Sequence, residues 1–394
     1  MIAEDGLLTF DDESFSWNCD VDAIQKNTMI PDSSAEIISN KIKRLETQLQ
    51  NFLKILSLIG YRFNYEIIRD ISTETTNGNS SAEDDKLSLA LLLKTLVESN
   101  ILEETSDGYQ FTHDKIQAAI QDLIDTDEKE QLHLKIGTKF LKRPGKMSKY
   151  FAARHLNCLT SDTAKKFIDD IMLARTNLQA AKYCECRYAF INAADFTRTG
   201  LALLGDGEEK WSIDYDLAFE LTESLVKLEF ILGNMDSCKQ ANQSLLLRTK
   251  SERRRINALA MELEILTNTD LQIEYAVSMG RRVLGELGIK VPRRLTVFHL
   301  ISKLNRVRKL IDGHTDEQVL NLGRINAELS DVTKVILLVS AQFFRHKKLI
   351  WAFYANVLAM EYTMMNGLSP DSVTSFCYLG VCETAIFRNI ERGF

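Results

Sequence analysis

The sequence predicts a mostly α-helical fold, in which a small winged-helix domain is followed by an α-solenoid of paired helices. Three observations lead to this prediction. The 394 residues include only four prolines and 18 glycines, so long stretches lack helix breakers. Apolar residues recur at three- and four-residue steps over most of the chain. A hydrophobic fraction of 45% is enough for packed cores, and the length allows two or three domains.

The first 24 residues differ from the rest of the chain. GLLTF (6–10) and FSWNCDV (15–21) flank an acidic turn, a pattern typical of a two-stranded hairpin. A lone hairpin is barely stable in water. We therefore expect residues 1–24 to be the β-hairpin remnant of a larger upstream domain.

Residues 25–128 show the order of a winged-helix domain. A helical apolar pattern spans 41–59, a short helix follows near 64–71, and a third helix covers 86–99. ILEET (101–105) and YQFT (109–112) then form a β-hairpin around Ser106-Asp107-Gly108. A further helix is expected from about His113 to Ile124.

From residue 129 to 394 the pattern changes to consecutive helices with short links, which is typical of tetratricopeptide-like hairpins. Small residues in 173–204 would let two helices approach closely. No polar capping helix follows the last one, so truncation at the C-terminus is expected. The expected helices are 129–142, 147–157, 163–180, 184–204, 213–232, 235–249, 252–268, 270–287, 294–311, 330–345, 348–366 and 370–391.

Composition narrows the class of protein. The net charge of −7 gives the chain as a whole no electrostatic reason to hold nucleic acid. Its seven cysteines are scattered without a C-x-x-C pair, as expected for reduced thiols in a cytoplasmic protein. The N-terminus has no secretory signal. The apolar stretches 335–344 and 349–360 are too short to span a bilayer, so no transmembrane segment is predicted.

Several segments resemble one family. FTHDKIQAAIQDLI (111–124) is similar to a signature of predicted signal-transduction ATPases, in which an AAA-like, STAND-type nucleotide-binding domain precedes a winged helix and tetratricopeptide-like repeats. GLLTFDDESFSWNCDVDAI (6–24) resembles the closing hairpin of that ATPase domain. Residues 173–233 resemble the first helical repeats, and LGELGIKVP (284–292) resembles a segment between repeats. Ile120 replaces a tyrosine that is typical of the family.

The resemblance implies that this region is linked to the catalytic domains of a larger signalling protein. Family members carry a protein kinase upstream, and GAF and histidine kinase modules downstream. The G-x-x-x-x-G-K-[ST] loop of the ATPase domain is absent from this sequence, and so are the kinase motifs H-R-D and D-F-G. We therefore expect no cofactor in this chain, with ATP and Mg²⁺ bound by an upstream domain. The chain itself is not expected to be an enzyme.

His113 and Asp114 form a candidate nucleotide sensor. The resemblance implies that this pair faces the upstream domain. Metal binding is disfavoured, since the other histidines lack H-x-x-x-H or H-E-x-x-H spacing. A carboxylate in the first turn of a helix also has a simpler explanation, because the N–H groups there lack partners.

The predicted winged helix has few cationic side chains that could contact DNA. The helix at 86–99 supplies only Lys86 and Lys94, and the wing carries Glu103, Glu104 and Asp107. Phosphate contacts require cations, so no nucleic-acid partner is expected.

One cationic cluster lies around Pro292 on an amphipathic pattern at 294–311. A solvated helix face and a surface for an anionic partner, either an acidic protein or a membrane, both remain open. The residues of this candidate patch are Arg281, Arg282, Arg293, Arg294, Lys303 and Arg306, with Lys290, Arg308 and Lys309 nearby.

The predicted function is therefore that of a non-catalytic regulatory or scaffold fragment. Its repeats would bind protein partners, and its winged helix would couple that binding to an upstream nucleotide-binding and kinase module. Two alternatives stay open: a stand-alone helical-repeat adaptor, and an ATP-binding kinase or ATPase whose catalytic domains lie elsewhere in a longer polypeptide.

Overall fold

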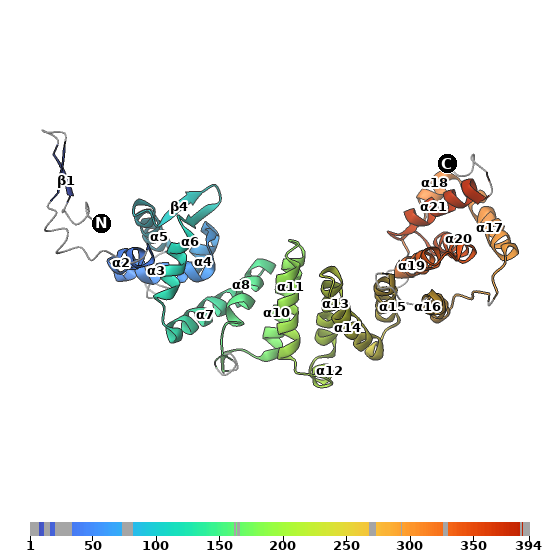
Figure 1. Ribbon diagram of the computed structural model, residues 1–394, viewed down its shortest axis with the longest axis horizontal. Coiled ribbons are helices and arrows are strands. Elements are labelled where there is room, and N and C mark those ends of the chain that lie inside the picture. The colour runs from blue at the N-terminus through green and yellow to red at the C-terminus, as the bar shows by residue number, and fades with distance from the viewer. Residues whose placement is uncertain are drawn as a thin grey trace. The chain divides into compact units, whose positions relative to one another are not determined.

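Helices dominate the part of the chain that the structure describes, which confirms the predicted fold class (Figure 1). A computed structural model describes residues 8–11, 16–19, 34–72, 82–160, 163, 166–267, 273–292, 294–325, 330–386 and 388. The chain divides into two units, Met1–Ile168 and Asp169–Phe394, and each is described by itself. The domain boundaries expected from the sequence stay a prediction.

Two short strands form the N-terminal hairpin. Strand β1 (Leu8–Asp11) pairs antiparallel with β2 (Ser16–Cys19), so that Leu8 lies opposite Cys19 and Asp11 opposite Ser16. The rest of the segment 1–24 lies outside the described residues. Its origin in an upstream domain therefore stays a prediction.

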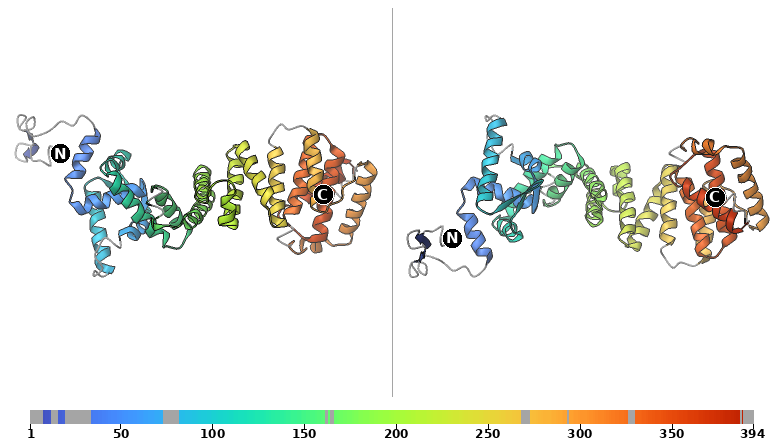
Figure 2. Two further views of the ribbon diagram at one scale, coloured as in Figure 1. Left: turned by 90° about the horizontal axis from the view of Figure 1, so that it is seen from below. Right: turned by 90° about the horizontal axis from the view of Figure 1, so that it is seen from above.

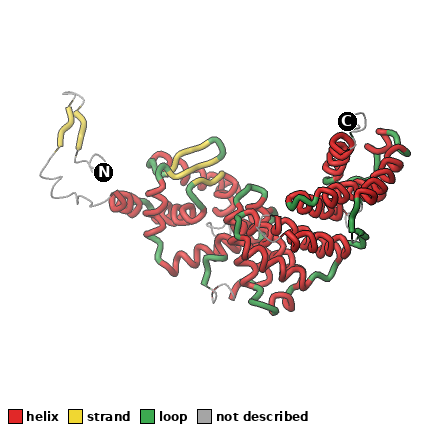
Figure 3. The backbone as a smooth tube through the Cα atoms, turned by 45° about the vertical axis from the view of Figure 1, so that its right-hand side comes forward, coloured by secondary structure: helices red, strands yellow, loops and turns green. Residues whose placement is uncertain are grey.

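A three-stranded antiparallel sheet and several helices make up the body of unit 1. The sheet order is β3-β5-β4, and Figure 3 shows these strands in yellow among red helices. Phe63 on β3 and Phe111 on β5 meet edge to face, with ring centroids 5.7 Å apart. The elements, in chain order, are α2 (Ser34–Lys43), α3 (Thr47–Ile59), β3 (Arg62–Asn64), α4 (Tyr65–Ser72), α5 (Ala82–Glu98), β4 (Leu102–Thr105), β5 (Gly108–Phe111) and α6 (Asp114–Asp122).

The helix predicted at 41–59 is in fact two helices, since α2 ends at Lys43 and α3 begins at Thr47. Gln50 provides the physical reason. Its side-chain Nε2 donates to the carbonyl oxygens of Lys43 (3.1 Å) and Leu45 (2.8 Å). These carbonyls at the end of α2 have no helical partner ahead of them, so the amide stabilises the break.

A helical hairpin, α7 (Thr126–Leu141) and α8 (Lys146–Leu156), completes unit 1. Lys54 on α3 pairs with Glu128 at 2.7 Å, and the guanidinium of Arg154 donates to the carbonyl of Ile59. The ammonium of Lys139 donates to the carbonyl of Ile71. These polar contacts hold the hairpin against α3 and α4.

Unit 2 is built of helical hairpins that follow one another in chain order from α10 to α15, as both views in Figure 2 show. Its elements are α10 (Asp170–Glu185), α11 (Phe190–Leu203), α12 (Glu209–Ile213), α13 (Tyr215–Ile231), α14 (Met235–Arg248), α15 (Glu252–Thr267), α16 (Ile273–Glu286), α17 (Val297–Asp312), α18 (Asp316–Leu320), α19 (Ser330–Arg345), α20 (Leu349–Asn366), α21 (Ser372–Val381) and a short π-helix (Cys382–Ile386).

Small residues let the first hairpins of unit 2 approach closely. Ala174, Ala180, Ala181, Ala193 and Ala194 are fully buried. A side chain at Gly200 would lie 3.0 Å from the side chain of Leu221 and 3.3 Å from a backbone oxygen of α10. The expected close approach within 173–204 is therefore confirmed.

One predicted helix boundary was misplaced, and two short helices, α12 and α18, were not predicted. The expected segments 163–180 and 184–204 divide in the structure at Cys186–Ala189, where Tyr188 has a positive φ of 59°. The amides of Tyr188 and Ala189 close this turn on Glu185 and Cys184. Helices α12 and α18 have five residues each, which are too few for a periodic signal.

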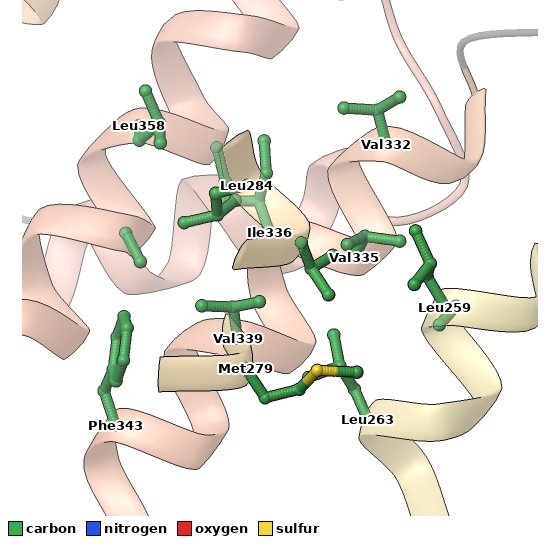
Figure 4. Packing of buried hydrophobic residues seen from close by; sticks show 14 of the residues in the cluster. Leu259, Leu263, Met279, Leu284, Val332, Val335, Ile336, Val339, Phe343 and Leu358 are labelled. Carbon is green, nitrogen blue, oxygen red and sulfur yellow. The ribbon is translucent and has the colours of Figure 1, made fainter. Parts of the chain in front are cut away.

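From α15 onwards the strict chain order is broken. Helix α19 packs against α15, α16 and α20, and α17 packs against α20. Figure 4 shows the shared core, where Leu259 and Leu263 of α15 meet Val332, Val335 and Val339 of α19. This core fixes the rotation of α19 about its axis, and hence which of its polar residues face α15.

Candidate functional site

A pocket in unit 2 brings apolar, amide and charged side chains of four helices together. It has a volume of about 210 Å³ and is lined by side chains of α13, α14, α15 and the start of α19. We call it the α15 pocket. Its lining residues are Phe219, Glu223, Val226, Lys227, Asn242, Leu245, Arg254, Asn257, Ala258, Ala260, Met261, Asp331 and Lys334.

Apolar packing positions the polar residues of the α15 pocket. Val332 and Val335 of α19 are buried in the core shared with α15, at 3% and 0% exposure. Asp331 and Lys334, which precede them, therefore turn towards the pocket. From the sequence, a helix could be predicted for this segment, but not the helix against which α19 packs.

Two cations of the α15 pocket, Arg254 and Lys334, are held in place by contacts with neighbouring side chains. The guanidinium carbon of Arg254 lies 4.5 Å from the ring centroid of Phe219, and one of its nitrogens lies 2.9 Å from Asp216. Lys334 pairs with Glu264 at 2.8 Å. An arginine has five N–H donors and a lysine three, so each cation has more donors than its ion pair uses.

Asn242 supplies an unsatisfied acceptor in the α15 pocket. The side chain is only 2% exposed, and its Nδ2 donates to the carbonyl of Ala258 at 3.0 Å. Its Oδ1 has no hydrogen-bond partner among the described residues. Most buried polar atoms in proteins are hydrogen-bonded, so a buried acceptor without a donor requires an explanation.

This pocket was not among the sites predicted from the sequence, although one signal was present. On α14, Cys238, Asn242 and Leu245 follow each other at helical steps and share the buried face. An asparagine at the middle of an apolar stripe is a buried polar group. Arg254 and Lys334 gave no comparable signal, because exposed cations on helices are ordinary.

His113 and Asp114 lie at the surface of unit 1. Helix α6 begins at Asp114, as the sequence predicted, with His113 as its N-cap. The backbone N–H of Lys115 lies 3.1 Å from His113 Nδ1 and 2.7 Å from Asp114 Oδ1. The two side chains are 60% and 80% exposed. Helix capping accounts for this geometry, and the role as a nucleotide sensor stays a prediction.

The cationic patch around Pro292 is split between α16 and α17. On α16, Arg281 lies over the ring of Trp351 at 5.3 Å, and Arg282 lies 3.7 Å from Glu286. An open hollow of about 550 Å³ borders these two arginines and Lys290.

Two further cations of the patch lie on α17 and share one acid. Lys303 and Arg306 both contact the carboxylate of Glu361, at 2.7 and 3.0 Å. Arg294 is exposed, and Arg293 lies outside the described residues. Part of the positive charge is thus neutralised within the protein, and an anionic partner for this patch stays a prediction.

The described residues contain neither a metal-binding cluster nor a membrane-spanning helix. Within the described residues, no group of three or more His, Cys, Asp or Glu side chains is placed to hold a metal ion. No helix in the described ranges is both long and apolar enough to cross a membrane.

The architecture is that of a helical-repeat protein, and one comparison points to signalling. No family model matches the chain. Over 448 aligned positions, the chain is 20% identical to the hybrid signal transduction histidine kinase G of Dictyostelium discoideum. The alignment covers 96% of this chain but only 13% of that protein. The chain is therefore similar, over nearly its whole length, to a small part of a signal-transduction kinase.

A solved structure gives a weaker likeness. The crystal structure of a Signal Transduction ATPase with Numerous Domains (STAND) protein with a tetratricopeptide repeat sensor, from Pyrococcus horikoshii, is 13% identical to the chain. The match covers 93% of this chain and 58% of that one, with a TM-score of 0.33. A score this low does not establish a shared fold.

Proposed function

We propose that this chain is a non-catalytic regulatory and scaffold region of a signal-transduction ATPase. In this proposal, residues 25–128 form a winged-helix domain and residues 129–394 form repeats that bind a protein partner. Partner binding is coupled to a nucleotide-binding and kinase module that these 394 residues do not contain. The proposal places the protein in the cytoplasm.

The stacking of helical hairpins from α10 to α15 is the observation that carries this proposal. From α10 to α14, each helix packs mainly against its neighbours in the chain, as in a helical-repeat array. Such arrays provide long surfaces for protein partners. The alignment with a signal-transduction histidine kinase over 96% of the chain supports a signalling context.

The winged-helix assignment rests on connectivity. Helix α3, strand β3, helices α4 and α5 and the β4–β5 hairpin follow one another, and the third strand of the sheet is β3. The turn of that hairpin carries Asp107, 3.4 Å from Arg62, and Gln110 contacts Glu103. An acidic wing disfavours DNA phosphates, so a protein-coupling role fits this domain better.

The decisive experiment compares two polypeptides from the same gene. One is the present chain, and the other extends upstream through any G-x-x-x-x-G-K-[ST] segment. Calorimetry with Mg·ATP is expected to give no heat for the present chain and binding for the longer one. In the longer polypeptide, His113→Ala should weaken ATP binding if His113 senses the phosphate.

Two results would contradict the proposal. Micromolar binding of Mg·ATP to the present chain would show a nucleotide site within it. A gene that encodes no nucleotide-binding segment upstream of Met1 would instead favour a stand-alone adaptor.

A further inference from the structure

We propose that the α15 pocket binds a free amino acid with an apolar side chain. This inference goes beyond the proposed function, because it assigns a small-molecule effector to the repeats and requires neither a protein partner nor an upstream domain. It rests on three features of the pocket: an unsatisfied buried acceptor, an apolar floor, and charges of both signs.

The buried acceptor calls for a donor on the ligand. Asn242 Oδ1 lacks a hydrogen-bond partner among the described residues, while its Nδ2 is already fixed by the carbonyl of Ala258. The amide therefore cannot simply turn over without losing that bond. An ammonium group can donate to Oδ1, and the carboxylates of Glu223 and Asp331 also line the pocket.

Those two carboxylates favour a charged amine over an amide N–H. A peptide bond could satisfy Asn242 Oδ1 by hydrogen bonding, but it would gain little from Glu223 and Asp331. A free ammonium gains from all three groups. The observations thus favour a free amino acid over an internal segment or the carboxyl end of a peptide.

The cations of the pocket offer hydrogen-bond donors to the carboxylate of such a ligand. Lys227, Arg254 and Lys334 line the same pocket. Each has an acidic partner, respectively Glu223 at 3.6 Å, Asp216 at 2.9 Å and Glu264 at 2.8 Å. Ion pairs leave further N–H donors on each cation. A carboxylate can accept hydrogen bonds from these donors without breaking the existing pairs.

The size and floor of the pocket set the side-chain class. Phe219, Val226, Leu245 and Met261 provide an apolar floor. The volume of about 210 Å³ lies below the range of roughly 300–1,000 Å³ that is usual for drug-sized ligands. An aliphatic or thioether side chain, such as that of leucine or methionine, fits a pocket of this volume with this apolar lining.

The test is calorimetric titration of the purified 394-residue chain with L-leucine, L-methionine and L-phenylalanine. We expect at least one of them to bind with a Kd of about 1 mM or tighter. Three further compounds test which groups of the ligand are needed. Isoamylamine lacks the carboxylate, and N-acetyl-L-leucine lacks the ammonium group. A tetrapeptide with a C-terminal leucine has the carboxylate and the side chain but no ammonium group next to them. Each should bind about tenfold more weakly than the free amino acid.

Matched lysine variants locate the site. Lys334→Met should weaken binding about tenfold, because it removes a cation of the pocket but keeps the length of the side chain. Lys182→Met is the control, because Lys182 is a similarly exposed, ion-paired lysine on α10 that does not line the pocket. Circular dichroism verifies that both variants fold.

Three outcomes would overturn the proposal. One is the absence of binding by all three amino acids at about 10 mM. The second is tighter binding of the tetrapeptide than of leucine, which would assign the pocket to a chain end. The third is equal loss of affinity in Lys334→Met and Lys182→Met, which would place binding elsewhere.

Discussion

His133 on α7 and His155 on α8 face each other with their Nδ1 atoms 2.9 Å apart. Both side chains are buried, at 9% and 1% exposure, and their ring centroids lie 5.1 Å apart. Such a pair forms one hydrogen bond when both rings are neutral and one Nδ1 carries the proton. Protonation of the second nitrogen would remove the acceptor and place charge in the interior.

This pair makes unit 1 sensitive to acid. Burial, together with His133 and Arg154, lowers the pKa of His155 to about 3, and burial also lowers the pKa of His133. The unfolded chain takes up protons near pH 6.5, whereas folded His155 does not do so until about pH 3. Stability is therefore expected to fall as the pH drops from about 6.5 towards 3.

A double variant tests this expectation. Replacing both residues by leucine removes the titrating groups, and exchanging both partners for apolar groups is often nearly neutral in stability. The Tm of the His133→Leu/His155→Leu variant should fall less between pH 7 and pH 5 than that of the unaltered protein. His113→Asn, which removes an exposed histidine and keeps an N-cap side chain, is the control. Equal pH dependence in all three proteins would refute the explanation.

The histidine pair also shows which features of the fold can be predicted from the sequence and which cannot. The apolar periodicity of 129–142 and 147–157 located α7 and α8 to within a few residues, because that signal is local. The contact between His133 and His155 depends on how the two helices rotate against each other, which no local pattern states. For the same reason the sequence found the helices of the α15 pocket but not the pocket.

Breaks in helices had similar causes. Gln50 separates α2 from α3 by binding carbonyls that precede it, and Tyr188 ends a turn in a left-handed conformation that its residue type disfavours. The first break depends on a side-chain contact and the second on a local backbone turn, and helix propensity predicts neither. A helix start near His113 was predicted correctly, because an acidic residue such as Asp114 in the first turn is a local signal.

Two glycines of α16 should respond oppositely to substitution by alanine. A side chain at Gly280 would lie 3.0 Å from Val339 and 3.6 Å from Phe343, in the core between α16 and α19. Nothing lies within 4 Å of the corresponding position at Gly285. Gly285→Ala should therefore stabilise unit 2 by about 0.5 kcal/mol through helix propensity. Gly280→Ala has the same gain but should lose about 1–3 kcal/mol through overpacking.

Urea unfolding of the two variants measures this difference. Because both changes lie in one helix, their effects on the unfolded chain are nearly the same. The expected order of unfolding free energy is Gly285→Ala, then the unaltered protein, then Gly280→Ala. Equal stability of the two variants would mean that α16 does not approach α19 as closely as the structure has it.

Arg308 of α17 and Glu383 of the π-helix after α21 form an ion pair with two hydrogen bonds, in which the carboxylate is buried and the arginine side chain is 23% exposed. Nε and Nη2 of Arg308 donate to the two carboxylate oxygens of Glu383, at 2.7 and 2.5 Å. Glu383 is only 2% exposed. The hydrogen bonds with Glu383 raise the pKa of Arg308, so the arginine stays charged.

Glu383→Gln should therefore cost unit 2 about 2–3 kcal/mol, since it removes the buried carboxylate that accepts two hydrogen bonds from the guanidinium of Arg308. The matched control is Glu220→Gln, which removes the acid of the exposed Lys182–Glu220 pair, with side chains 50% and 47% exposed. This control should cost no more than about 1 kcal/mol. Adding Arg308→Met to Glu383→Gln should restore part of the loss, because it removes the positive charge that faced the lost carboxylate. Equal free energies of urea unfolding for Glu383→Gln and Glu220→Gln would show that the Arg308–Glu383 pair contributes no more than a surface contact.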